Sequence, residues 1–231
     1  MDLLIDSFWS ALLLLASADE ELLKIVKVSL TVSGFSTLIA AVTGVPLGFW
    51  VAFGKFPGKG MVTTILHTLL ALPTVVVGLF VYAFISRRGI LGPLDLLYSQ
   101  QAMIIGQSIL IIPVVAAFTI TAVKKVDKRY SQTAMTLGAN RFQTAMVVAM
   151  EARYGIMAAI TAAFGRVIAE VGVSMMLGGN IKGFTRTMTT AMALEYDKGE
   201  FILAVALGLV LLTIAFGLNF ALTLFQSRVR A

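Results

Sequence analysis

Residues 124–153, KKVDKRYSQTAMTLGANRFQTAMVVAMEAR, form a basic, helix-prone island inside a chain that is otherwise largely apolar. The runs on either side of this island are long enough to cross a lipid bilayer. A polar, positively charged segment between two such runs must lie outside the hydrocarbon core. The island therefore predicts a docking element at the membrane surface.

Composition sets the class of the protein. Hydrophobic residues make up 58% of the chain and charged residues 13%, and the mean hydropathy is +0.93. A soluble domain is nearer half apolar and a quarter charged, so we expect an all-α integral membrane protein in which residues 1–231 form one domain. Cysteine is absent, which excludes disulfides, thiolate metal sites and thiol catalysis. The net charge of +6 does not indicate nucleic acid, because in a membrane chain the distribution of charge matters more than its total.

Five segments reach the roughly 20 apolar residues that a helix needs to span a bilayer. They are residues 25–53, 61–86, 102–123, 154–177 and 201–225. The apolar run 3–16 is shorter, is interrupted by Asp6 and contains Trp9. We expect residues 1–20 to form an N-terminal interfacial helix, with a sixth span as the alternative.

Lys and Arg are distributed unequally between the two sides of these spans. The side that holds the island carries ten basic and two acidic residues, and the other side carries seven basic and nine acidic residues. The positive-inside rule therefore predicts that the island and the C-terminus are cytoplasmic and that the N-terminus is outside.

Three prolines, Pro46, Pro73 and Pro113, fall within the predicted spans. Each removes a backbone donor and tends to kink its helix. Ordinary curvature of a packed bundle accounts for such kinks, and so does a gate in which the spans separate at the kinks. The sequence leaves both interpretations open.

Arg166 and Glu170 lie four residues apart in the predicted span 154–177. On one helix this spacing places them on the same face, and charges inside a membrane require a partner or a water-filled path. They form either an internal ion pair that orients the helix or a pair beside a translocation path. Gly172 follows, and the glycines before Asn180 predict that the helix ends in a turn there.

The segment 181–200 is too polar to span a membrane, and it brings Thr185, Arg186 and Thr187 together. Hydroxyls, a guanidinium and amides beside glycine would suit an oxyanion at an external vestibule. Helix capping and surface solvation explain the same residues as well. A substrate contact here is one of two interpretations.

The centre of the island has a recognisable order of residues: Gln132-Thr133-Ala134, then Gly138-Ala139, then Phe142-Gln143-Thr144. This order resembles the cytoplasmic loop of binding-protein-dependent ABC importer permeases. That loop usually reads Glu-Ala-Ala, three residues and Gly, and ends near Leu-Pro. Here Gln132 and Thr133 replace Glu-Ala, and Met150-Glu151 stands where Leu-Pro is common. The glycine and its spacing are retained.

A second stretch, residues 165–195, reads GRVIAEVGVSMMLGGNIKGFTRTMTTAMALE. It is similar to the Arg…Glu-x-Gly…Gly-Asn-Ile…Thr-Arg-Thr stretch of molybdate/tungstate-type permeases. The residues at 169–172 and 183–187 look more similar to those of tungstate permeases than to those of molybdate or sulfate permeases. Together with the span pattern, the resemblance covers the chain from about residue 20 onward.

The resemblance implies a type I ABC importer permease fold with five transmembrane helices and a coupling-helix loop at 124–153, in a prokaryotic cytoplasmic membrane. It implies a second permease copy, two ATP-binding cassette subunits and an external substrate-binding protein for an oxyanion, tungstate before molybdate. The positions implied to contact the ATPase are Gln132, Thr133, Ala134, Gly138, Ala139, Asn140, Arg141 and Phe142. From their chemistry and position, the residues that we expect in the translocation path or gate are Arg166, Glu170, Gly172, Asn180, Thr185, Arg186 and Thr187.

The chain contains no Gly-rich phosphate loop of the Walker type. We therefore expect that it does not hydrolyse ATP alone, that it binds no cofactor or metal, and that ATP and Mg bind to the partner subunit. Membrane lipid is a further expected partner, because four basic residues cluster where the island meets the membrane. They are Lys124, Lys125, Lys128 and Arg129.

Two other classes of protein are weaker alternatives. A secondary transporter or channel for a small anion would account for the spans and for Arg166 and Glu170, but no inverted repeat is visible. An intramembrane enzyme would need a nucleophile and a base. The chain has a single histidine, His67, and no cysteine, so the sequence offers little support for that class.

Overall fold

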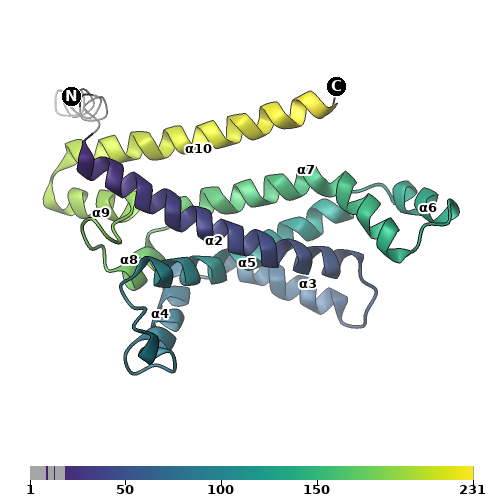
Figure 1. The fold of residues 1–231 in the computed structure, drawn as a ribbon, viewed down its shortest axis with the longest axis horizontal. Coiled ribbons are helices and arrows are strands. Elements are labelled where there is room, and N and C mark those ends of the chain that lie inside the picture. The colour runs from purple at the N-terminus through teal and green to yellow at the C-terminus, as the bar shows by residue number, and fades with distance from the viewer. Residues whose placement is uncertain (1–8, 10–12, 14–18, 231) are drawn as a thin grey trace.

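The computed structural model describes residues 19–230 together with Trp9 and Leu13. All regular structure in this part of the chain is helical (Figure 1). The elements are α2 (Glu20–Phe53), α3 (Lys59–Thr68), η1 (Leu69–Ala71), α4 (Thr74–Ile85), η2 (Gly92–Leu94), α5 (Gln100–Lys124), α6 (Lys128–Thr136), α7 (Arg141–Ile168), α8 (Gly172–Gly178), α9 (Met188–Lys198) and α10 (Phe201–Arg230). The predicted interfacial helix over residues 1–20 lies almost entirely outside the described residues.

Helix α2 has clear start and stop signals. The side chain of Asp19 accepts hydrogen bonds from the amides of Glu21 and Leu22, which satisfies two of the unpaired donors at the helix start. At the other end, the ammonium of Lys59 donates to the carbonyl of Gly54 at 3.0 Å and also to that of Ala52. With 34 residues the helix is about 50 Å long, which is more than a bilayer core requires.

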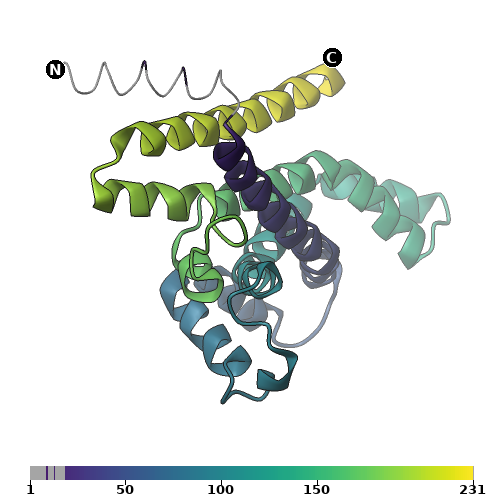
Figure 2. The same ribbon diagram turned by 60° about the vertical axis from the view of Figure 1, so that its left-hand side comes forward.

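Helix α5 is the centre of the bundle, and α2 packs along it with the two backbones in contact (Figures 1 and 2). A Cβ atom on Gly48 would lie 2.4 Å from the carbonyl oxygen of Ala116, and one on Gly44 would lie 2.9 Å from that of Ile112. Glycine at these positions permits the close crossing that packed membrane helices use. Most residues of α5 are buried by its neighbours, whereas only a minority of the residues of α7 are buried.

The predicted continuous span 61–86 is wrong, because the chain breaks there. Helix α3 passes into the single turn η1, and α4 then leaves at an angle of 99°. Pro73 lies directly before α4, in extended conformation, and has no amide hydrogen to continue the helical ladder. The proline predicted to kink this span therefore separates it into two helices.

The predicted span 154–177 is also interrupted. Helix α7 begins much earlier, at Arg141, and ends at Ile168. After the non-helical residues 169–171 the chain forms the short helix α8, so Glu170 lies in the break and outside both helices. Helix α7 thus carries the chain from the island into the bundle as one 28-residue helix.

Three helices are long and apolar enough to cross a membrane: α2, α5 and α7. The bent pair formed by α3 and α4 is a fourth candidate, and α10 contributes a shorter apolar stretch over Phe201–Gly217 within the described residues. The all-α membrane class is confirmed. The total of five or six spans stays a prediction.

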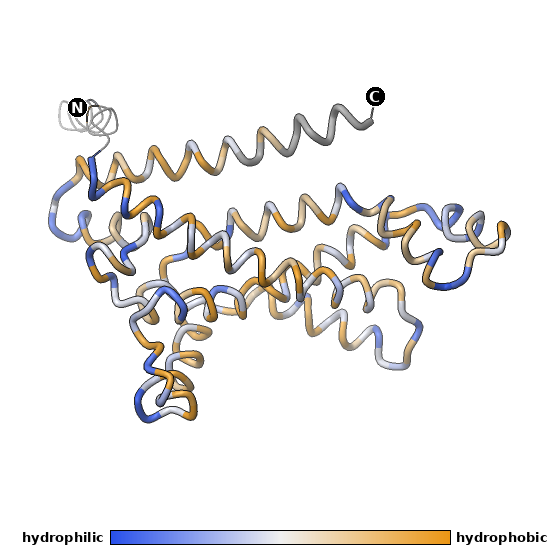
Figure 3. The backbone as a smooth tube through the Cα atoms, viewed as in Figure 1, coloured by the Kyte–Doolittle hydropathy of each residue, from blue (hydrophilic) through white to orange (hydrophobic). Residues whose placement is uncertain are grey.

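Hydrophilic residues gather at the ends of the long helices (Figure 3). One end holds the α2–α3 connection and α6, and the opposite end holds the start of α2 and the α9–α10 connection (Figure 1). This separation agrees with the two sides that the sequence assigned from the positions of its charges. The apolar middle has the arrangement that a bilayer requires.

Candidate functional site: paired helix breaks and an exposed helical turn

The two broken segments meet inside the bundle. A guanidinium nitrogen of Arg166, near the end of α7, donates to the carbonyl oxygen of Leu70 in η1 at 3.4 Å. After the break, Gly172 at the start of α8 lies so close to α4 that a Cβ atom there would be 2.9 Å from the hydroxyl of Thr74. Residues that flank the break at 169–171 therefore contact the region of the other break, at Leu70 and Thr74.

Glu170 does not pair with Arg166, so the predicted ion pair is wrong. Helix α7 ends at Ile168, and the four-residue spacing no longer places both side chains on one helical face. Glu170 is 8% exposed, and its carboxylate accepts from the amide of Val173 at 3.2 Å, in the first turn of α8. Its backbone carbonyl accepts from the hydroxyl of Thr189 at 2.8 Å. The side chain of Glu170 thus stabilises the first turn of α8, and its backbone carbonyl connects the break to α9.

A buried amide network holds α8 in place. Gln107 of α5 is 1% exposed, and its side-chain oxygen accepts from the hydroxyl of Ser36 in α2 at 3.2 Å. Its side-chain nitrogen donates to the hydroxyl of Ser174 in α8 at 2.9 Å. Three helices are therefore tied together by one side chain. Sequence reasoning missed this role, although a glutamine within a predicted span was the available signal.

The turn after α8 uses its hydroxyl groups internally. Thr185 is fully buried, and its hydroxyl accepts from the amide of Ile181 at 3.0 Å and donates to the carbonyl of Gly178. Thr187 begins α9 in a capping box with Thr190. These contacts favour the capping interpretation for both predicted threonines.

Arg186 and Asn180 keep polar atoms without partners in the same turn. The Arg186 guanidinium lies 3.5 Å from the Glu21 carboxylate, which also accepts from Lys182 at 2.7 Å. Asn180 has a positive φ of 51° and donates to the carbonyl of Thr190 at 3.2 Å. The Nε atom of Arg186 and the side-chain oxygen of Asn180 are buried and have no hydrogen-bond partner. The turn therefore retains an unsatisfied donor close to the start of α2.

This part of the site suits passage of a solute better than bond chemistry. Non-helical backbone at membrane depth is tolerated where it is buried in protein or lines a water-filled path. Two interrupted spans in contact are the feature that transporters use to expose backbone groups to a solute. Within residues 19–230, no group of three or more His, Cys, Asp or Glu side chains could hold a metal ion.

The second part of the site is the turn between α6 and α7, at one end of the molecule (Figure 1). The amide of Gly138 donates to the carbonyl of Met135 at 3.0 Å, and that of Ala139 donates to Ala134 at 2.9 Å. These two bonds form a Schellman motif, which requires the positive φ of 84° at Gly138. The glycine predicted to divide the island does so.

Helix α7 begins immediately after this turn. Asn140 and Gln143 form a capping box, in which each side chain bonds the backbone of the other residue at 2.9 and 2.8 Å. The turn is therefore rigid at both ends. The expectation of two short helices is half correct, because α6 has 9 residues but α7 has 28.

The turn presents apolar side chains to the outside. Leu137 is 83% exposed and Phe142 is 74% exposed. A cavity of about 470 Å³ lies beside Leu137, between α6 and α7. Among the other positions predicted to contact a partner, Gln132, Thr133, Gly138, Asn140 and Arg141 are exposed, Ala139 is half-buried and Ala134 is buried. Exposed apolar groups rimmed by polar ones mark an interaction surface.

Known proteins with similar sequences are membrane permeases. The family described as "Binding-protein-dependent transport system inner membrane component" matches residues 44–231. The chain is 41% identical over 220 residues to the tungstate uptake system permease protein of Campylobacter jejuni, covering 95% of this chain and 92% of that protein. It is 41% identical over 203 residues to a probable anion ABC transporter permease protein of Haloferax volcanii, covering 86% and 88%. It is 28% identical over 206 residues to the molybdenum transport system permease protein of Escherichia coli, covering 82% and 90%.

Solved structures share the fold at low sequence identity. The inward-facing MetNI methionine ABC transporter superposes with a TM-score of 0.73 at 19% identity, covering 90% of this chain and 96% of that chain. A bacterial ABC transporter that imports the acidic polysaccharide alginate superposes with a TM-score of 0.74 at 18% identity, covering 92% and 81%. The fold is therefore that of ABC importer membrane subunits.

Proposed function

We propose that this chain, which belongs to the family of binding-protein-dependent transport system inner membrane components, is the permease subunit of an ATP-driven importer for an oxyanion. Tungstate is the preferred candidate. Relatives that are 41% and 37% identical are named tungstate uptake permeases, and a third that is 41% identical is named an anion permease. The molybdenum permease of Escherichia coli is more distant, at 28%.

The observation that carries the proposal is the exposed turn at 137–142. In an importer of this kind the permease must receive the motion of a separate ATPase, so its contact needs to be both accessible and rigid. Leu137 and Phe142 supply apolar surface, and the Schellman motif and the capping box hold the turn in one conformation. The segment 124–153 is then the coupling loop.

Helix α7 is the part that would transmit this motion. It runs without interruption from the turn at Asn140 to Ile168, two residues after Arg166, which contacts the other break. A displacement of the coupling loop therefore reaches the paired breaks through one rigid helix. There the short helices α4 and α8 can tilt about residues 69–73 and 169–171 to open or close a path.

An oxyanion at the paired breaks would meet favourable groups. The Arg166 guanidinium carries a positive charge, and interrupted helices expose backbone amides. Asn180, Thr185, Arg186 and Thr187 lie in the adjoining turn, where Arg186 keeps an unsatisfied donor. Glu170 and Gly172 shape the break and do not offer a positive charge to the solute.

The proposed assembly contains a second permease copy, two ATP-binding cassette subunits and an external substrate-binding protein. One face of α4 is apolar and exposed in the single chain, with Val75 at 50%, Leu79 at 50% and Phe80 at 66%, which suits packing against a second copy or lipid. The end that holds α6 carries the excess of basic residues and is placed in the cytoplasm, with the N-terminus outside. ATP and Mg bind to the separate ATPase.

The test is solute uptake by the complete importer reconstituted in vesicles with its ATPase and binding protein. Uptake of tungstate should require ATP and the binding protein, and excess unlabelled molybdate should compete more strongly than sulfate. Uptake driven by an ion gradient without ATP would indicate a secondary transporter. ATP-dependent uptake of an amino acid or a sugar in place of these anions would contradict the substrate assignment.

A further inference from the structure

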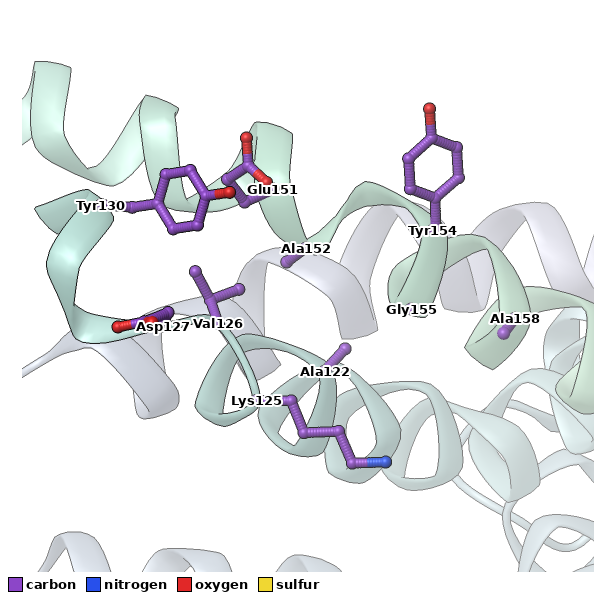
Figure 4. A pocket seen from close by; sticks show the side chains of 10 residues that line it. All are labelled: Ala122, Lys125, Val126, Asp127, Tyr130, Glu151, Ala152, Tyr154, Gly155 and Ala158. Atoms are coloured by element: carbon purple, nitrogen blue, oxygen red, sulfur yellow. The ribbon is translucent and has the colours of Figure 1, made fainter. Parts of the chain in front are cut away.

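A polar cavity beside the island continues into an apolar groove. The cavity has a volume of about 460 Å³ and lies where the end of α5 and the start of α6 face residues 151–158 of α7 (Figure 4). A second cavity of about 250 Å³ lies next to it, between α5 and α7. The two share Ala122, Lys125, Gly155 and Ala158, so they form one continuous surface.

The two ends of this surface lie at different heights along the bundle. On α5 the lining extends from Lys125 back to Phe118, which is about 10 Å along the helix axis. On α7 it extends from Glu151 to Ala159, which is about 12 Å. In both helices the charged residue is at the island end and the apolar residues lie toward the middle of the bundle. In a bilayer that covers the apolar middle of the bundle, this surface would cross the boundary between headgroups and hydrocarbon.

Three charged side chains line the polar end. Asp127 is paired with Arg129 at 3.1 Å, and the other two, which have opposite signs, have no ion-pair partner among the described residues. The ion pairs and side-chain hydrogen bonds among residues 19–230 include neither the ammonium of Lys125 nor the carboxylate of Glu151. Lys125 lines both the polar cavity and the apolar groove, whereas Glu151 lines the polar cavity alone. Figure 4 shows Lys125 extending along α5 away from Glu151, which lies beside Tyr130. The order along the surface is thus apolar wall, positive charge, negative charge.

We propose that this surface binds one phospholipid with a primary-amine headgroup, of the phosphatidylethanolamine class. Such a lipid has the same order of groups from the hydrocarbon outward: acyl chain, phosphate and ammonium. Lys125 faces the phosphate, and Glu151 accepts hydrogen bonds from the ammonium. A purely anionic headgroup would leave Glu151 beside a negative charge.

The proposal rests on the membrane position of the bundle and is independent of which solute is transported. It also refines the expectation of an anionic lipid at the basic cluster. Lys124, Lys128 and Arg129 are exposed and do not line the surface, so they can attract anionic lipids in general. Lys125 and Glu151 together select one headgroup.

Native mass spectrometry of the purified full-length chain in mild detergent tests the site. Phosphatidylethanolamine, phosphatidylcholine and phosphatidylglycerol are added in turn, and the adducts that survive mild activation are counted. We expect one phosphatidylethanolamine per chain, retained roughly threefold better than the other two lipids, since exposed charge pairs contribute modestly. Phosphatidylcholine is the informative comparison, because its quaternary ammonium cannot donate a hydrogen bond to Glu151.

Three variants separate the contributions. Glu151→Gln should remove the preference for phosphatidylethanolamine and raise phosphatidylglycerol retention, because it removes the carboxylate that lies beside the anionic headgroup. Lys125→Gln should lower the retention of all three phospholipids. The matched control is Lys124→Gln, a neighbouring exposed lysine outside both cavities, which should leave the preference for phosphatidylethanolamine over phosphatidylcholine unchanged.

Equal retention of the three lipids by the wild type, or an unchanged preference in Glu151→Gln, would overturn the proposal. Loss of the adduct when two chains associate would assign the surface to a second copy of the permease. Loss of the adduct on addition of the ATPase would assign it to that subunit. Either displacement would also overturn the lipid assignment.

Discussion

The guanidinium of Arg166 lies 3.4 Å from the carbonyl oxygen of Leu70, and this contact joins the two interrupted spans of the bundle. The helical ladder is broken at Pro73, three residues later, so the carbonyl group of Leu70 receives no hydrogen bond from an amide four residues ahead. Inside a membrane such groups must find another donor. Arg166 supplies one, and its charge is held by backbone dipoles and has no carboxylate partner among the described residues.

Removing this contact should impair transport. We expect Arg166→Ala to lower the rate of ATP-driven uptake about tenfold, because a hydrogen bond to a charged group contributes about 1.5–3 kcal/mol and this one is long, at 3.4 Å. Uptake is measured in vesicles that contain the complete importer. Lys27→Ala is the control, since Lys27 is an exposed cation of α2 outside both parts of the candidate site. Equal losses in both variants would show that general loss of charge is responsible.

The Gln107 network should behave as a unit. We expect Gln107→Leu to destabilise the chain by about 1–3 kcal/mol, because it leaves the buried hydroxyl of Ser174 without the 2.9 Å bond from the amide. Ser174→Ala in the Gln107→Leu background should cost less than it does alone. The measurement is a double-mutant cycle: thermal unfolding in detergent of the wild type, the two single variants and the double variant. Strict additivity of the two changes would contradict a direct interaction.

Two glycines of α2 provide a matched test of helix packing. We expect Gly48→Ala to destabilise by about 1–3 kcal/mol, because the new methyl group would lie 2.4 Å from the carbonyl of Ala116. Gly34→Ala adds the same group where no atom lies within 4 Å, so it should be neutral or stabilising by about 0.5 kcal/mol. The midpoint of thermal unfolding measures both. Similar shifts in the two variants would be inconsistent with the α2–α5 crossing.

The continuous spans and the divided island were predictable because their signals are local. The run 102–123 matches α5 to within two residues at each end, since an uninterrupted apolar stretch follows the capping residue Ser99. The turn at Gly138 was predictable because glycine favours the left-handed conformation that ends α6. Each of these features depends on residues that are neighbours in the chain.

The break at 169–171 and the buried network were not predictable because their causes are tertiary. Residues 167–171 contain no proline, yet helix α7 ends there. The Glu170 carboxylate accepts a hydrogen bond from the amide of Val173, and the Glu170 carbonyl accepts one from the hydroxyl of Thr189. A four-residue spacing predicted an ion pair with Arg166 on the assumption of a continuous helix. Similarly, the position of Gln107 within a span does not reveal that the facing helices carry Ser36 and Ser174.

The central claim is that the turn at Gly138 couples this chain to an ATPase, and a pair of glycines tests it most directly. Gly138 and Gly199 have φ values of 84° and 80°, and neither has an atom within 4 Å of an added Cβ. Gly199 ends α9 in the same hydrogen-bonded motif. Its amide donates to the carbonyl of Tyr196 at 3.0 Å, and the amide of Glu200 donates to the carbonyl of Glu195 at 2.8 Å. Substitution by Asp therefore imposes similar backbone strain at both sites.

The measurement is the stimulation of ATP hydrolysis by the loaded binding protein in the reconstituted importer. Gly138→Asp should abolish the stimulation while the chain still inserts in the membrane, because the added carboxylate stands on the docking surface between Leu137 and Phe142. Gly199→Asp should retain most of it. Normal stimulation in Gly138→Asp, or equal loss in both variants, would contradict the coupling role of the turn.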